Sequence, residues 1–405
     1  MKSWKEYKIE DIGIVVGGAT PSTKDSSNYD GNIPWITPKD LANHNGRYIS
    51  HGERMISLQG FNNCSCKMLP KNSILFSSQA PIGYVAIANN ELCTNQGFKS
   101  IIPNNNIVDS LFLYYLLVYY KPVIENMGSG TTFKEVSASV MKNLAINIPE
   151  IDEQKKIAAI LSSLDDKIEL NSRINRNLEQ QAQALFKAWF VDFEPFKNGK
   201  FVDSEFGRIP EGWNIVEANH FMTISKDSIN PTKNPMCLYT HYSIPAFDEA
   251  LTPEIQFGHK IKSNKFLVRS GMTLFSKLNP RIKRIWFINE ASDNSICSTE
   301  FIPYESLGQN CYFLYCYLNS NMFYSQAMSL VNGATGSHQR FSPNETLKFL
   351  FAYKKEIVEE FNVLVAPTLK EMSELSLETR KIAKLRDTLL PRLMSGELNI
   401  NTITE

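Results

Sequence analysis

Two long stretches of the chain carry apolar side chains at every third or fourth position, residues 157–189 and residues 361–393. An apolar stripe with a spacing near 3.5 residues and charged flanks is the heptad pattern of a coiled coil. Neither stretch contains a glycine, and each is far longer than the dozen or so residues of an average helix. The pattern therefore predicts two long paired helices, in which Asn171, Asn175 and Thr379 interrupt the stripe and fix its register.

Prolines suggest where these helices begin and end. Pro149 precedes the first, and Pro195 follows it. In the second, Pro367 falls inside the stripe, and a proline kinks a helix or sits in its first turn. We therefore expect a short helix over residues 355–365 and a longer one from 367. Pro391 is expected to end it, with Ser395-Gly396 as its cap.

The segment before each long helix has a different texture. It is rich in Gly, Pro, Asn, Ser and aromatic residues, with short β-branched runs at residues 33–36 and 84–88. This pattern is typical of an α/β (α+β) domain with several strands and long loops. The aromatic stretches 111–120 and 312–318 have helical spacing, which predicts core helices.

The chain also repeats itself at an offset of about 200 to 206 residues. Five matches occur in the same order: 72–82 with 271–281, 93–98 with 297–301, 111–116 with 312–318, 128–133 with 333–338, and 185–190 with 390–395. A repeat of this length predicts two related domains. We place the first domain at residues 1–150, the central helix at 151–195, the second domain at 196–354, and the distal helix with the C-terminal tail at 355–405.

Composition narrows the class of protein. Apolar residues make up 43% of the 405 residues and charged residues 21%, which is typical of a globular protein. The 42 basic residues balance the 42 acidic ones, which excludes a uniformly basic nucleic-acid-binding protein but allows a basic stripe on one face. No signal peptide or membrane span is expected, and the seven cysteines lack paired CxxC spacing. We expect a reduced, cytoplasmic protein that does not bind membranes.

Motifs for catalysis and metal binding are missing. There is no GxxxxGK[ST] nucleotide loop, and Gly17-Gly18 lacks the third glycine of a dinucleotide fingerprint. The Asn/Asp-Pro-Pro-Phe/Tyr motif of amino-methyltransferases is absent as well. Cys64 and Cys66, with His44 and His51 upstream, do not have the spacing of a zinc site. We therefore expect no catalytic residue and no metal site.

Charge placement is the positive signal. Residues 259–284 contain eight Lys or Arg and no acidic residue, and residues 55–90 are also free of Asp and Glu. Cations bind phosphates, and Arg, Asn, Gln, Ser and Thr contact base edges. The glycine loops 128–134 and 333–340 would allow close approach to a phosphate. Solvated faces and plain turns remain the alternatives. The candidate DNA-binding residues are Ser77, Ser78, Gln79, Thr131, Thr132, Lys134, Lys277, Arg281, Lys283, Arg284, Ser337, His338, Gln339 and Arg340.

The order domain–helix–domain–helix resembles the specificity subunit of type I restriction–modification systems. Residues 33–41 and 77–86 resemble the framework of its first target-recognition domain. Residues 130–137 and 146–149, with Glu153 and Gln154, are similar to its domain-to-helix junction. Residues 164–171 through 185–193 resemble its central spacer, and residues 385–398 its distal one. The stretch that begins at Tyr353 departs from the Ile-Pro junction expected there, which leaves the edge of the second domain open.

The resemblance implies an adaptor with no catalysis of its own. Each target-recognition domain would recognise one half of a bipartite site in double-stranded DNA. The helices would form an antiparallel coiled coil that spaces the domains and docks two methyltransferase subunits, and restriction subunits would complete the complex. S-adenosylmethionine, ATP and Mg²⁺ would belong to those partners, so that DNA methylation needs the whole assembly.

Two other classes of protein stay open on the residues alone. A stand-alone DNA-binding regulator with a coiled-coil dimer interface would explain the heptads but not the internal repeat. A methyltransferase fused to its own recognition domain would need a donor-binding motif.

Overall fold

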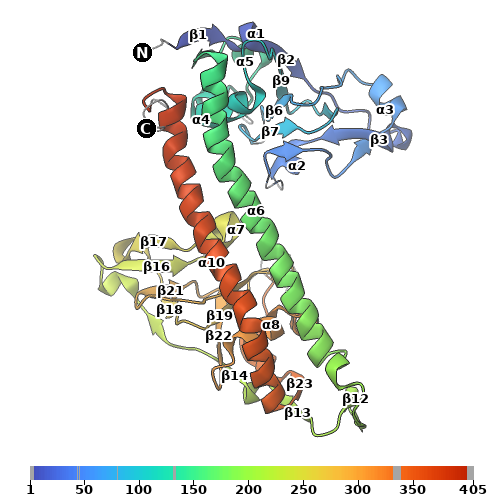
Figure 1. The fold of residues 1–405 in the computed structure, drawn as a ribbon, viewed down its shortest axis with the longest axis vertical. Helices are drawn as coiled ribbons and strands as arrows, with labels where there is room; N and C mark the ends of the chain where they lie inside the picture. The colour runs from blue at the N-terminus through green and yellow to red at the C-terminus, as the bar shows by residue number, and fades with distance from the viewer. Residues whose placement is uncertain are drawn as a thin grey trace. The chain divides into compact units, whose positions relative to one another are not determined.

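The computed structural model describes residues 4–42, 44, 46–79, 81–130, 134–331 and 339–398. The chain divides into two compact units (Figure 1). The first comprises Met1–Glu169 and Lys381–Glu405, and the second comprises Leu170–Arg380. The second unit is therefore inserted into the sequence of the first.

Two helices of 40 residues, α6 (Ile151–Phe190) and α10 (Lys355–Met394), each contribute to both units. At 1.5 Å per residue, each is about 60 Å long. In the second unit, Asn171 Nδ2 donates to Glu378 Oε2 (2.8 Å) and Asn175 Nδ2 donates to Ser376 Oγ (3.0 Å). Residue numbers rise along one helix as they fall along the other, so the pair is antiparallel, as expected. The two asparagines in the apolar stripe do lie at the helix–helix contact.

The expected break at Pro367 is wrong. Helix α10 passes through Pro367 without interruption and ends at Met394, beyond Pro391. Pro367 is exposed, and the hydrogen bond that it cannot make would have gone to the carbonyl of the exposed Val363, where water can replace it. On the opposite side, Phe361, Val365 and Leu369 are buried in the core, which keeps the helix continuous here. The predicted cap is confirmed, since Gly396 has φ +74° and the Leu398 N–H bonds to Arg392 O (2.9 Å).

The first unit is built on a five-stranded sheet in the order β2-β9-β6-β7-β4. All neighbours in it are antiparallel except β7 and β4. A three-stranded sheet, β5-β3-β8, and the antiparallel pair β1-β10 complete it. The strands are β1 (Lys5–Lys8), β2 (Gly13–Gly17), β3 (Tyr29–Ile36), β4 (Tyr48–Ile49), β5 (Met55–Ile56), β6 (Ile74–Phe76), β7 (Val85–Ala88), β8 (Cys93–Thr94), β9 (Lys99–Pro103) and β10 (Ala145–Ile148).

The helices of this unit cover the sheet. The longest within the domain is α4 (Ser110–Met127), which packs on β6 and β7. Its buried side chains, together with Leu393 and Met394 from the end of α10, form one core with Ile157 and Leu161 of α6. The expectation that residues 111–120 belong to the core is confirmed. The short helices are α1 (Ile9–Ile12), α2 (Pro38–Ala42), α3 (Leu58–Asn62) and α5 (Ala138–Lys142).

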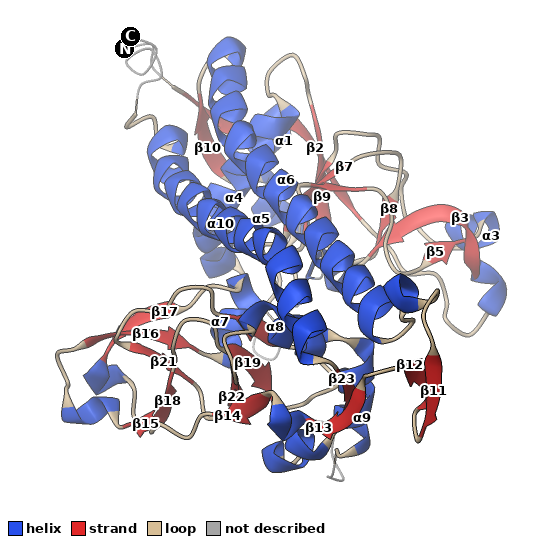
Figure 2. Ribbon diagram, turned by 60° about the horizontal axis from the view of Figure 1, so that its bottom comes forward, coloured by secondary structure: helices blue, strands red, loops and turns tan. Residues whose placement is uncertain are grey.

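The second unit contains two main sheets (Figure 2). One has the order β14-β22-β19-β20, and the other has the order β15-β18-β21-β16-β17. The strands are β11 (Phe201–Ser204), β12 (Gly207–Pro210), β13 (Asn214–Glu217), β14 (Met222–Ile224), β15 (Ser228–Ile229), β16 (Leu238–Tyr242), β17 (Glu254–Phe257), β18 (Lys265–Leu267), β19 (Thr273–Ser276), β20 (Ile285–Phe287), β21 (Ser295–Cys297), β22 (Phe301–Ser306) and β23 (Leu350–Tyr353). The helices are α7 (Ile244–Ala250), α8 (Cys311–Asn319) and α9 (Asn321–Ser329).

The two units repeat the same topology, which confirms the internal repeat. The order β2-β9-β6-β7 in the first corresponds to β14-β22-β19-β20 in the second. The closing pair β1-β10 corresponds to β13-β23, and the parallel contact of β3 with β8 corresponds to that of β16 with β21. In the second unit, α8 is buried against Phe186, Phe190 and Phe361 of the long helices. Within the described residues, no helix is long and apolar enough to cross a membrane.

An ionic cluster fastens the first domain to its part of the long helices. Arg47 is only 5% exposed; it pairs with Asp166 and with Glu169 (3.2 Å), and it also contacts Tyr115 Oη. The Tyr115 hydroxyl donates to Asp165 Oδ2 (2.6 Å), and burial together with this bond raises the pKa of Tyr115. Arg386 of α10 also donates to Asp165 (2.7 Å). The cluster thus links the domain, α6 and α10 through one set of charges.

We expect Arg47→Ala to lower the free energy of unfolding of the first unit by about 2–3 kcal/mol. Removing one partner of a buried ion pair costs more than this, but Asp166 and Glu169 are partly exposed and water compensates them in part. Urea unfolding of the full chain measures the effect. Lys156→Ala, at an exposed position of α6, is the matched control and should change stability by less than about 0.5 kcal/mol. Equal midpoints for the two variants would contradict the role of the cluster.

Candidate nucleic-acid interface

In the first unit, the connection between β6 and β7 lies beside the segment that follows the glycine loop. Gln79 and Glu135 face each other in an antiparallel bridge, and the Val136 N–H donates to Ser78 O (2.9 Å). Lys99 Nζ lies 3.1 Å from Glu135 Oε1, which ties β9 to the same segment. The segment at Ser78 and Gln79 and the segment at Glu135 and Val136, more than 50 positions apart in sequence, therefore lie side by side.

The second unit has the equivalent surface. The Asn279 N–H donates to Gln339 O (3.1 Å), so the connection between β19 and β20 meets the end of the second glycine loop. The Lys277 N–H donates to Glu300 O (3.0 Å), and the Arg340 guanidinium forms a two-pronged ion pair with the Glu300 carboxylate, both distances being 3.1 Å. The ion pair raises the pKa of Arg340 above its ordinary value. The repeat thus extends from the sheet order to the local contacts of the candidate site.

The structure contradicts the prediction that the Ser77 and Ser78 side chains contact DNA. Both side chains are fully buried. The Ser77 hydroxyl donates to Pro81 O (2.8 Å) and accepts from the Tyr84 N–H, while the Ser78 hydroxyl donates to Gly97 O (3.2 Å). These serines shape the connection after β6, and a buried, bonded hydroxyl does not face a ligand.

Arg284 is corrected in the same way, and Lys283, although exposed, has its ammonium bonded within the domain. Arg284 is 7% exposed and forms a two-pronged pair with Asp248 (2.6 and 2.8 Å). Lys283 Nζ donates to Asn319 O (2.5 Å) and lies 5.5 Å from the centre of the Tyr324 ring. Partial burial lowers the pKa of Lys283, although the charge of Glu179 raises it. Both cations hold the domain together, so the basic run contains fewer available charges than its sequence indicates.

Four candidates remain open to a ligand in the described structure. Lys134 and Arg281 are exposed, Gln79 and Lys277 are half-buried, and the three cations have no charged partner among the described residues. Gln339 contributes its backbone carbonyl to the contact with Asn279, and Arg340 is exposed but paired. Thr131, Thr132, Ser337 and His338 lie outside the described residues.

Sequence reasoning missed Lys99, Glu135 and Glu300. The two glutamates fix the chain at the end of each glycine loop, yet neither lies in a basic run, and Glu135 occurs only within the junction-like stretch 130–137. Their only signal in the sequence is that each is an acidic residue close to a glycine loop or to an aligned strand. That signal is too general to select them.

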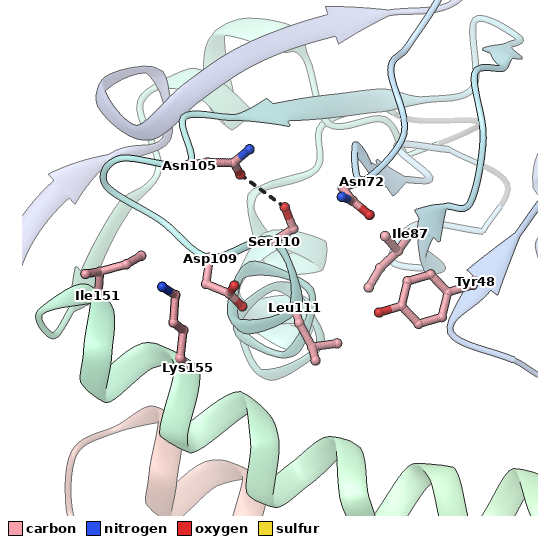
Figure 3. Close-up of a pocket in the computed structure, with 9 residues that line it drawn as sticks. All are labelled: Tyr48, Asn72, Ile87, Asn105, Asp109, Ser110, Leu111, Ile151 and Lys155. Atoms are coloured by element: carbon pink, nitrogen blue, oxygen red, sulfur yellow. Dashed lines mark hydrogen bonds between the residues drawn. The ribbon is translucent and has the colours of Figure 1, made fainter.

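The first unit contains a polar pocket of about 380 Å³ whose lining stabilises the fold (Figure 3). It lies where α4 and α6 begin, and Asp109 and Lys155 are the charged residues in its lining. The Asp109 carboxylate accepts from the Phe112 N–H (2.9 Å) and so caps α4, and Ser110 Oγ donates to Asn105 Oδ1 (3.4 Å). Its lining therefore holds a helix cap and does not supply a nucleophile with an adjacent base.

The cysteines near residue 64 form a small sulfur-rich core. Cys64 Sγ lies 3.1 Å from Cys66 Sγ, and Cys93 Sγ lies 3.9 Å from Met68 Sδ. Burial raises the pKa of Cys93 to about 11, so its thiol stays protonated at neutral pH. No group of three or more His, Cys, Asp or Glu side chains arranged to hold a metal ion occurs within the described part of the chain.

Two units with a shared strand order, each with the connection after β6 or β19 against its glycine-loop region, and a pair of antiparallel helices that contributes to both, define a modular two-domain protein. Comparison with known proteins shows its family. The family model described as the type I restriction modification DNA specificity domain matches residues 1–180. The MjaIX specificity subunit of Methanocaldococcus jannaschii is 35% identical over 99% of this chain and 95% of its own length. The HindI specificity subunit of Haemophilus influenzae is 26% identical over 98% of this chain and 100% of its own.

The fold agrees with this relationship. A crystal structure of a type I restriction–modification S subunit from M. genitalium superimposes with a TM-score of 0.58 at 15% identity, covering 96% of both chains. The chain belongs to the family of type I restriction enzyme specificity subunits. It is the DNA-recognition component of such a system, is not itself catalytic, and works with DNA and with partners in a complex.

Proposed function

We propose that each unit recognises one half of a bipartite site in double-stranded DNA, with the surface formed where the connection after β6 or β19 meets the segment after the glycine loop. The observation that carries this proposal is that the connection after β6 and the connection after β19 each meet the region of the glycine loop in their own unit, through Gln79 with Glu135 in the first and through Asn279 with Gln339 in the second. Exposed or half-buried cations flank each one: Lys134 in the first, Lys277 and Arg281 in the second. A cation beside a polar surface suits a phosphate next to base edges.

The long helices are proposed to space the two units and to dock two methyltransferase subunits, with restriction subunits joining the larger complex. S-adenosylmethionine, ATP and Mg²⁺ would then be bound by those partners. The pairing of α6 with α10 inside one chain supports this over a regulator that dimerises through its helices. Because Asn171 and Asn175 already meet Glu378 and Ser376 of the same chain, the apolar stripe needs no second copy.

Replacing Lys277 and Arg281 together with alanine should weaken DNA binding and flatten its dependence on salt. Each cation that no longer binds a phosphate lowers the slope of log K against log salt by about 0.9, so the slope of the double variant should fall by up to about 1.8. Fluorescence anisotropy at several salt concentrations, with the specificity subunit in complex with its methyltransferase partner, measures the slope.

The matched control is the double variant Lys200→Ala and Arg208→Ala, which removes the same charge from the hairpin β11-β12 in the same unit. Its slope should stay at the wild-type value. If both double variants shift the slope equally, the effect is one of net charge, and the proposed surface does not contact DNA.

A further inference from the structure

The antiparallel pair of β16 and β17 in the second unit, called the ribbon below, carries an exposed apolar face. Leu238 is 49% exposed, Ile255 is 72% exposed and Phe257 is 37% exposed. Leu238 pairs with Phe257 and Thr240 with Ile255, so these side chains share one face of the ribbon, while Tyr239 on the other face is buried. Met236, 74% exposed, lies in the turn just before β16. We call Leu238, Ile255 and Phe257 the ribbon face.

An exposed apolar strip of this kind marks an interaction surface, because a soluble chain gains nothing from leaving several large side chains together in water. The corresponding ribbon of the first unit lacks it. There β3 pairs with β5, with Ile33 opposite Ile56, and Ile56 is fully buried. The ribbon face is therefore a property of the second domain and not a requirement of the shared fold.

The outer end of the ribbon is two strands wide. Strand β21 pairs with β16 only at Thr240–Tyr242, whereas β17 pairs with it from Leu238 onward. Strand β17 is itself the edge of its sheet (Figure 2). The major groove of B-DNA, about 12 Å wide, admits a two-stranded ribbon of this kind.

Cations surround the outer end of the ribbon. Lys233 lies in the turn Pro231–Lys233 before β16, Lys260 lies in the turn Gly258–Lys260 after β17, and Lys262 follows; all three are exposed. Glycine at position 258 allows the two turns to touch, since a Cβ there would lie 2.4 Å from both Asn234 O and Pro231 O. The His259 N–H then donates to Pro235 O (3.1 Å). The lysines are thus held on either side of the same ribbon end.

Acidic residues lie away from the outer end of the ribbon. Residues 228–247 and 255–289 contain no Asp or Glu. Glu254, at the inner end of β17, is bonded to the Gln256 side chain, and the exposed Asp293 lies in the loop whose Asn294 carbonyl accepts from the Thr240 N–H. An apolar centre with a purely cationic outer rim matches a nucleic acid better than a protein surface, because DNA interfaces are strongly positive whereas protein interfaces mix both signs at the rim.

We propose that the β16-β17 ribbon inserts into the major groove of the half-site recognised by the second unit, with the ribbon face against thymine methyl groups and Lys233, Lys260 and Lys262 on the flanking phosphates. Apolar side chains recognise thymine through its C5-methyl group, which no other base of unmodified DNA carries. This inference rests on the proposed function. It assigns the recognition of bases by the second domain to one pair of strands. It gives the two domains different means of recognising their half-sites.

The test uses the complex of this chain with its methyltransferase subunit, whose target is first determined by sequencing methylated DNA. Binding is then compared for duplexes that carry thymine or uracil in the second half-site. The wild-type complex should bind the uracil duplex about fourfold more weakly for each methyl group that contacts the ribbon. The double variant Ile255→Ser and Phe257→Ser should bind the two duplexes equally. Uracil in the first half-site should not show this dependence on the ribbon.

Two further variants complete the design. The first is a triple variant that combines Lys233→Ala, Lys260→Ala and Lys262→Ala. Its slope of log K against log salt should be smaller in magnitude by about 0.9 for each of these lysines that binds a phosphate in the wild type. Phe206→Ser, which removes a 54% exposed aromatic side chain from the turn between β11 and β12, is the matched control and should still distinguish thymine from uracil.

Three results would overturn the inference: a second half-site without thymine, equal binding of both duplexes by the wild type, or a ribbon variant that binds DNA normally but no longer assembles with the methyltransferase subunit. The last result would make the ribbon face a protein interface. In each case a wild-type complex that still methylates a bipartite site leaves the proposed function intact. A complex that methylates no such site would instead contradict the proposed function itself.

Discussion

Exchanging residues 1–150 for the equivalent domain of a relative should change one half of the methylated sequence and leave the other half unchanged. Every contact that builds the first surface, from Gln79 with Glu135 to Lys99 with Glu135, lies inside that segment. The contacts of the second surface, including Asn279 with Gln339, all lie in the second unit. Sequencing the methylated sites of cells that carry the exchanged gene measures the outcome.

The exchange suits the start of α6, although the replacing domain must also supply partners for Asp165, Asp166 and Glu169 in place of Tyr115 and Arg47. Gln154, the fully buried residue at the start of α6, donates to the carbonyls of Pro149 (2.8 Å) and Ile107 (3.0 Å) and accepts from the Asp109 N–H (2.9 Å). All three partners are backbone groups, so a new domain with different side chains can still supply them. An exchange that replaces the recipient's first domain with its own sequence serves as the control for the cloning junction. A change in both half-sites would show that the two domains do not choose their bases independently.

Inserting seven residues into each long helix should lengthen the gap between the half-sites by about three base pairs and leave the half-sites themselves unchanged. One heptad adds about 10 Å of helix, and base pairs are stacked about 3.4 Å apart. The insertions belong after Glu169 and after Arg380, where the chain passes between units. Asp165 with Arg386 and Asn171 with Glu378 then keep their partners. Sequencing of methylated sites measures the gap.

A heptad inserted into α6 alone is the control. In that variant no single register lets Asp165 meet Arg386 while Asn171 meets Glu378, so one part of the stripe is mispaired and the chain should fold poorly. If the doubly extended chain folds, assembles and methylates sites with the original gap, the helices do not set the spacing.

The heptad stripe and the internal repeat were sufficient to predict the long helices and the two related domains, because both depend on patterns that span many residues. The break at Pro367 was predicted wrongly because one local preference was considered without the core contacts of Phe361, Val365 and Leu369. Those contacts come from parts of the chain that the helix sequence does not reveal. Packing outweighed the absence of one hydrogen bond on the solvent side.

The candidate site was predicted less well, for a different reason. A basic run shows how many charges are present but not which of them are already neutralised. Arg284 is paired with Asp248, which lies 36 positions earlier, and Arg340 is paired with Glu300, 40 positions earlier. Likewise, the hydroxyls of Ser77 and Ser78 are occupied by carbonyls that only the folded turn brings near. Such pairings are set by tertiary structure, and the spacing of residues in the sequence does not predict them.

The insertion of the second unit into the first also determines the order in which the chain can mature on the ribosome. The first unit needs Leu393 and Met394, which complete its core around Ile157 and Leu161. After Glu169 has been made, roughly 225 more residues must be added before both have been synthesised, which at 5–20 residues per second takes roughly 11 to 45 seconds. The second unit is continuous in sequence and is complete before that. The second unit, although it begins later in the sequence, is therefore complete before the first. A chain that is released ahead of residue 393 has a first unit with an open core.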